Sequence, residues 1–151
     1  MSPSRAPRGL GVLLALALAA STAGCADPQE RYCDTVADQQ DRLSEIAGSG
    51  DALALFEARE VYAALAADAP DDIADEWRLV LDRIDALERA LDEAGADPEA
   101  YDPEDPPAGV DAREQARIRQ AAEDLVDLDV VSAMGDLEQQ ALDVCGTPLR
   151  L

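Results

Sequence analysis

The chain has no histidine, lysine or asparagine, and aromatic residues make up only 3% of its 151 residues. Without histidine it lacks the usual activating base for a serine or cysteine nucleophile and the commonest side-chain metal ligand. Its 12 basic residues are therefore all arginines, and 33 acidic residues set the net charge at −21. An excess of acid on this scale excludes electrostatic binding to nucleic acid or to an anionic membrane surface.

The first 24 residues lack acidic side chains and have the layout of a secretory signal peptide. Residues 1–9 carry Arg5 and Arg8, and residues 10–20, LGVLLALALAA, form an apolar run that is followed by small residues. This run is shorter than the roughly 20 residues of a membrane-spanning helix, which favours a cleaved signal over a permanent anchor. Removing residues 1–24 would take away two arginines and no acid, which changes the net charge from −21 to −23.

The residues Ala23, Gly24 and Cys25 follow this apolar run. They resemble the lipobox of bacterial lipoprotein precursors, a small-residue motif that ends in cysteine. The resemblance implies that the thiol of Cys25 receives a diacylglyceryl group and that cleavage leaves Cys25 as the first residue of the mature chain. Thr22 departs from the motif, which usually has an aliphatic residue there. Two alternatives stay open: cleavage by the ordinary signal peptidase after Ala19, and a Cys25 that is a plain thiol.

Cysteine pairing depends on this assignment, because three cysteines leave one over after a single disulfide. If Cys25 is lipidated, Cys33 and Cys145 are the obvious pair, near the two ends of the mature chain. A bridge that closes so long a loop stabilises a fold by about 4 kcal/mol in the chain-entropy model. Two cysteines without a histidine do not make a zinc site, so we expect a disulfide and no metal there.

Strand signals are almost absent, whereas apolar residues recur at helical spacing along nearly the whole mature chain. Proline, glycine and capping residues set the expected helix boundaries. The expected helices run from Asp27–Pro28 to Gly48, from a cap at Ser49 or Asp51 to a break near Ala69–Pro70, from Asp71–Asp72 to Gly95, and from a capping box at Asp111 and Glu114 to Gly146, with a kink or restart near Asp127 and Asp129.

The apolar stripes define the side of each helix that should face a shared core. Expected core residues are Cys33, Val36, Leu43, Ile46, Leu55, Phe56, Tyr62, Leu65, Ile73, Trp77, Val80, Ile84, Leu87, Leu91, Ala94, Ile118, Ala122, Leu125, Val130, Met134, Leu137, Ala141 and Val144. For Trp77, core packing is favoured over stacking against a ligand. We therefore predict an all-α bundle of four or five helices, with the disulfide joining the first and last helices.

Residues 97–110 are too rich in proline to continue a helix and should form an acidic loop across one end of the bundle. This loop contains five hard oxygen donors, Asp97, Glu99, Asp102, Glu104 and Asp105. They make it a candidate calcium site. The turn glycine and the distant bidentate glutamate of a calcium loop are missing, and Pro98 and Pro103 restrict the backbone. A solvated acidic linker is therefore the favoured interpretation.

The predicted organisation is a signal peptide over residues 1–24, a lipidated tether over 25–28 and a helical domain over 29–151. From LAADAPDDIADEW to QQALDVCGTPL, the domain also resembles lipoproteins of high-GC Gram-positive bacteria that have no assigned function. That resemblance implies an envelope location, with the chain anchored through Cys25 to the extracytoplasmic face of the cell membrane. It implies no active site and no cofactor.

A catalytic set is not evident in the sequence. Paired carboxylates such as Asp71–Asp72 and Asp75–Glu76 are typical of helix starts, and Ser44, Ser49 and Ser132 have no histidine to activate them. We therefore expect a non-catalytic interaction or accessory module that contacts an envelope protein and no nucleic acid. A lipoprotein that binds a small ligand or a divalent cation is the alternative, and a hydrolase is the third possibility.

Overall fold

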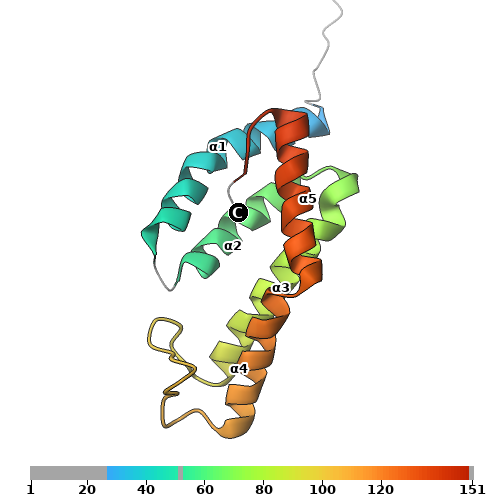
Figure 1. The fold of residues 1–151 in the computed structure, drawn as a ribbon. Coiled ribbons are helices and arrows are strands. Elements are labelled where there is room, and N and C mark those ends of the chain that lie inside the picture. The colour runs from blue at the N-terminus through green and yellow to red at the C-terminus, as the bar shows by residue number, and fades with distance from the viewer. Residues whose placement is uncertain (1–26, 51–52, 150–151) are drawn as a thin grey trace, which may run out of the picture.

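The structure is a computed structural model and describes residues 27–50 and 53–149. These residues form five α-helices and one 3₁₀ turn, and they contain no strand (Figure 1). The elements are α1 (Pro28–Ser49), α2 (Ala54–Asp68), the 3₁₀ turn η1 (Asp71–Ile73), α3 (Ala74–Glu93), α4 (Ala112–Leu125) and α5 (Leu128–Cys145). The predicted all-α class is confirmed, as is the restart that separates the last two helices.

Helix α1 starts where the sequence predicts and ends slightly later. Asp27 Oδ1 accepts a 3.0 Å hydrogen bond from the backbone N–H of Gln29. Pro28 occupies the first turn, where its missing N–H costs nothing. The predicted end at Gly48 is one residue too early, because the helix continues through Ser49 and is capped by Gly50. That residue has a φ of 65°, a left-handed conformation that glycine adopts without steric penalty.

The predicted start of α2 is also corrected. Ser49, one of its two predicted caps, is the last residue of α1, where its hydroxyl donates a 2.8 Å hydrogen bond to the carbonyl of Ile46. The other predicted cap, Asp51, lies outside the described residues. The break near Ala69–Pro70 is confirmed, since α2 ends immediately before it.

Helix α3 belongs to two hydrophobic clusters. Its first half packs with α1, α2 and α5 in the larger cluster, and its second half packs with α4 and the loop that precedes α4 in a smaller one (Figure 1). The buried members of the smaller cluster are Leu91, Ala96, Val110 and Ile118. Phe56 of α2 packs against both clusters. The fold is therefore a four-helix core extended at one end by the α3–α4 hairpin.

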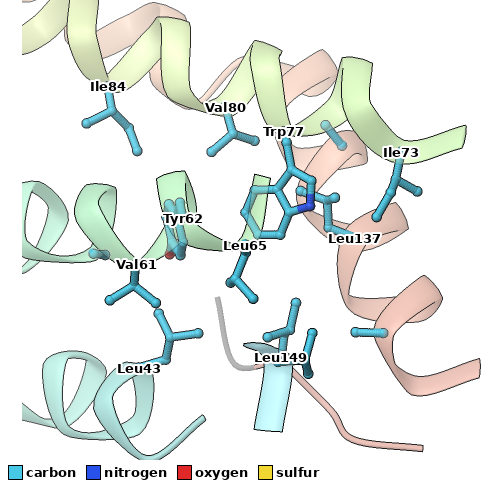
Figure 2. Packing of buried hydrophobic residues seen from close by; sticks show 14 of the residues in the cluster. Leu43, Val61, Tyr62, Leu65, Ile73, Trp77, Val80, Ile84, Leu137 and Leu149 are labelled. Carbon is cyan, nitrogen blue, oxygen red and sulfur yellow. The ribbon is translucent and has the colours of Figure 1, made fainter. Parts of the chain in front are cut away.

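Trp77 lies at the centre of the larger cluster, as predicted. Its side chain is 0% exposed, and its ring centroid lies 5.8 Å from that of Tyr62 (Figure 2). Tyr32 is equally buried, although the predicted stripe named its neighbour Cys33, which is only half-buried. Burial raises the pKa of the Tyr32 hydroxyl, and the adjacent Trp77 side chain partly offsets that rise. Trp77 and Tyr32 are therefore residues of the core and do not form a surface for a ligand.

The predicted inner face of α4 is shifted by one residue. Ala121 is buried, whereas the predicted Ala122 is exposed. The reason is that α4 packs chiefly on α3, so the buried stripe passes through Ile118 and the position three residues later. The side of α4 that carries Ala122 is left without a helix over it.

The disulfide joins Cys33 of α1 to Cys145 of α5, as predicted. The two Cα atoms are 5.1 Å apart, and 112 positions separate the cysteines in the sequence. Beyond α5, the chain folds back so that Leu149 is buried in the larger cluster, and Gln40 Nε2 donates a 3.3 Å hydrogen bond to the carbonyl of Pro148. Covalent and packing contacts thus fix both ends of the domain against each other.

An ion pair links α2 to α3. Arg59 Nε donates to Asp85 Oδ1 at 2.7 Å, and a second guanidinium nitrogen donates to the other carboxylate oxygen at 3.2 Å. These hydrogen bonds hold the pKa of Asp85 below its usual value. An acid whose pKa is lower in the folded chain stabilises the fold above its unfolded pKa and stops doing so as the pH falls.

We therefore expect Asp85→Asn to destabilise the domain at neutral pH but to have little effect in acid. The pair is half-exposed, so the expected loss at pH 7 is about 0.2–1 kcal/mol, and it should shrink below about pH 4. Thermal unfolding of both proteins at several pH values measures the difference. Asp82→Asn, an exposed position on α3, is the control and should show no such trend. A stability difference between the wild-type protein and Asp85→Asn that stays constant down to pH 3 would contradict this role of the ion pair.

Candidate functional site

A capping box fixes the start of α4. Asp111 Oδ1 accepts hydrogen bonds from the backbone N–H groups of Arg113 at 2.8 Å and Glu114 at 2.9 Å. Glu114 Oε2 in turn accepts from the backbone N–H of Asp111 at 2.8 Å, which confirms the predicted motif. The hydrogen bonds from Glu114 and Arg113 lower the pKa of the Asp111 carboxyl.

The loop between α3 and α4 is held at both ends. Gly95, with a φ of 60°, allows the chain to leave α3 at the predicted point. Near the other end, Val110 is buried and its carbonyl accepts a 2.9 Å hydrogen bond from Gln115 Nε2. Between these points, Tyr101 packs against the smaller hydrophobic cluster. The loop consequently forms one wall beside the α3–α4 hairpin (Figure 1).

A groove of about 510 Å³ opens between this loop, α3, α4 and the start of α2. We name it the apolar groove. Its lining residues are Leu55, Phe56, Leu87, Leu91, Pro98, Tyr101, Pro103, Glu104, Gln115, Ile118, Arg119, Ala122, Glu123 and Val126. Most of these side chains are apolar, and the charged ones are two glutamates and one arginine. The groove exists because α4 leaves the Ala122 side uncovered and the loop stands beside it.

A second, smaller hollow of about 230 Å³ adjoins the apolar groove. It is lined by Leu55, Tyr62, Val80, Ile84, Leu125, Val130, Val131 and Met134, none of which is charged. Leu55 lines both hollows, and the adjacent residues Leu125 and Val126 line one each. The exposed apolar residues Val126, Leu128 and Val131 lie at the junction of α4 and α5. Together the two hollows, which share Leu55, and these exposed residues form what we name the apolar track, on an otherwise strongly acidic protein.

The paired acids considered for catalysis lie elsewhere. Asp71 and Asp72 are in the 3₁₀ turn before α3. Asp75 and Glu76, in the first turn of α3, share a shallow hollow with Ser132, which also contains two acids of α5, Asp129 and Asp136. This brings a hydroxyl and carboxylates together, which the sequence alone does not indicate.

The five candidate calcium ligands are all exposed. Asp97 Oδ1 accepts a 3.0 Å hydrogen bond from the backbone N–H of Glu99, and Asp102 Oδ1 accepts one of 2.8 Å from that of Glu104. Both aspartates thus close turns of the loop. Across residues 27–50 and 53–149, no three histidine, cysteine or acidic side chains converge where they could hold a metal ion. The predicted lipidation site, Cys25, lies outside the described residues.

Comparison with protein-family models, curated proteins and solved structures finds no match to this chain. Within the part of the chain that the structure describes, no helix combines the length and apolar character needed to cross a membrane. The candidate site is therefore identified from the geometry of the apolar groove alone. The sequence contains a partial signal for it, because the apolar stripe of α3 runs on to Leu87 and Leu91, which belong to the cluster shared with α4 and the loop before it.

Proposed function

We propose that the chain is a non-catalytic binding module of the cell envelope and that the apolar groove is its binding surface. In this proposal a lipid on Cys25 tethers the module to the extracytoplasmic face of the cell membrane. The signal-peptide layout of residues 1–24 and the lipobox-like residues Ala23, Gly24 and Cys25 support the tether. The groove supports the binding role.

The observation that carries the binding role is the apolar lining of an open groove on a chain of net charge −21. Exposing apolar side chains to water costs roughly 25 cal/mol for each square ångström, so a folded domain normally covers them. A contiguous apolar surface bordered by charged residues is typical of a site that a partner covers. Phe56 and Leu87, which are half-buried, contribute to the groove.

A small apolar ligand is the second candidate, and the size of the groove favours it. Sites for small molecules commonly measure about 300–1,000 Å³ and combine an apolar lining with a few polar groups. The groove, at about 510 Å³ with Tyr101, Gln115 and Arg119 in its lining, meets both criteria. Divalent-cation binding and hydrolysis have no comparable supporting feature, so we do not propose them.

Proximity labelling from the native, anchored protein tests the proposed function. We expect the wild-type protein to enrich specific envelope neighbours, and Ala122→Arg to lose them because a long cationic side chain would obstruct the groove. Ala116→Arg places the same charge on an exposed position of α4 outside the groove and should keep those neighbours. A version on an unrelated lipoprotein anchor separates neighbours of the domain from neighbours of the anchor.

The proposed function fails if the wild-type domain enriches no neighbour beyond those found with the anchor alone. It also fails if Ala122→Arg and Ala116→Arg enrich the same neighbours as the wild-type protein. Circular-dichroism melting of both variants confirms that the comparison is made between folded proteins.

A further inference from the structure

We propose that the apolar groove binds a basic amphipathic α-helix of another protein. This inference rests on the proposed function, because it names the chemistry of the partner that the same groove receives.

The backbone requirement favours a helix over an extended segment. Residues 27–50 and 53–149 contain no strand, so they offer no sheet edge with which an extended peptide could pair. An extended peptide in the groove would bury N–H and C=O groups against mostly apolar side chains. Each unsatisfied group would cost roughly 1–3 kcal/mol. A helix satisfies its backbone internally and presents only side chains, so it avoids this cost.

The continuity of the two hollows indicates a partner longer than one side chain. The apolar groove and the smaller hollow meet at Leu55 and at the end of α4. An amphipathic helix projects apolar side chains from successive turns at positions i, i+3, i+4 and i+7. Successive turns of such a row would place apolar side chains along the groove and the smaller hollow, and they would cover the exposed Val126 of the groove and Val131 of the smaller hollow.

The charges around the track indicate that the partner helix is basic. Glu104 and Glu123 line the groove, and Asp127 directly precedes the exposed Leu128. Arg119 is the one basic residue among the side chains that line either hollow. A second copy of this chain, with its net charge of −21, would be repelled, and so would an anionic membrane surface. Lysines or arginines beside the apolar row of a partner would instead face carboxylates.

A fluorescent model helix of about 18 residues tests the inference, with leucine at the helical spacing and lysine elsewhere. Every described helix and both hydrophobic clusters lie within residues 27–149, so a protein of residues 26–151 retains the whole site. We expect anisotropy titrations to show saturable binding that weakens with salt. Ala122→Arg should weaken binding about tenfold or more, whereas Ala116→Arg should not. A peptide with serine in place of leucine should not bind.

Decyl maltoside, a neutral amphiphile used below its micelle concentration, separates this inference from the proposed function. If the detergent binds the wild-type protein but not Ala122→Arg, while the leucine–lysine helix fails to bind, the groove is a binding site and the basic-helix inference is overturned. Equal helix binding by the wild-type protein and Ala122→Arg also overturns it. If neither probe binds, the proposed use of the groove fails as well.

Discussion

Reduction of the disulfide between Cys33 and Cys145 is expected to lower the melting temperature of the domain by roughly 10–20 °C. The bridge closes a loop of 112 positions. A loop of that length lowers the entropy of the unfolded chain, which stabilises the folded state by about 4–5 kcal/mol. Both cysteines are only half-buried, so their replacement removes little packing. The expected loss of stability therefore comes mainly from the entropy that the unfolded chain regains when the bridge is broken.

Thermal unfolding of Cys145→Ser, and of the wild-type protein with and without a reductant, measures this effect. The double variant Cys33→Ser/Cys145→Ser is the matched control, because a reductant should not change its melting temperature further. Alkylation of the native oxidised protein should label neither cysteine. Labelling of both, or melting temperatures that agree between the reduced and oxidised proteins, would show that packing alone closes the bundle.

Much of the fold can be predicted because the decisive sequence features act locally. The capping box at Asp111 and Glu114 needs only residues three positions apart. Pro28 fixes the backbone at the start of α1, and Gly95 allows the left-handed conformation that follows α3. The regular apolar spacing around Trp77 likewise requires a buried stripe wherever the helix packs. These elements were predicted correctly for this reason.

The errors occur where a neighbouring element decides the outcome. Ala121 and Ala122 are identical side chains on one helix, and only the direction from which α3 approaches selects the first for burial. Tyr32 and Cys33 differ in the same way, since the position of α5 places the cysteine at the edge and the tyrosine inside. Helical periodicity alone cannot specify such directions to within one residue.

The candidate site could be predicted only in part. The apolar spacing predicts Leu87 and Leu91 as core residues. Leu91 is a buried member of the smaller cluster and Leu87 packs against it, but both also line the open groove. The groove depends on the position of the acidic loop beside α4. That position brings Tyr101 into the lining of the groove. No local pattern in residues 97–110 encodes that placement, because it results from the packing of Val110 and Tyr101 against residues of α3 and α4.

Replacement of Cys25 by serine is expected to abolish lipid attachment and to release the domain from its stable membrane anchor. In the proposed tether, the thiol of Cys25 is the group that receives the diacylglyceryl lipid, and a serine hydroxyl is a much weaker nucleophile. One acyl chain gives only marginal membrane binding, whereas two chains at about 0.8 kcal/mol for each buried CH₂ hold a protein stably. The change should therefore be nearly complete.

Incorporation of an alkyne-tagged fatty acid in living cells, combined with fractionation and the mass of the N-terminus, measures this outcome. The wild-type protein should carry the tag and begin at Cys25, and Cys25→Ser should carry none. Cys33→Ser is the matched control and should keep the tag, since that thiol belongs to the disulfide. An untagged wild-type protein that begins after Ala19 would instead identify the ordinary signal peptidase as the processing enzyme. In that case the groove would have to meet its partner without a membrane tether.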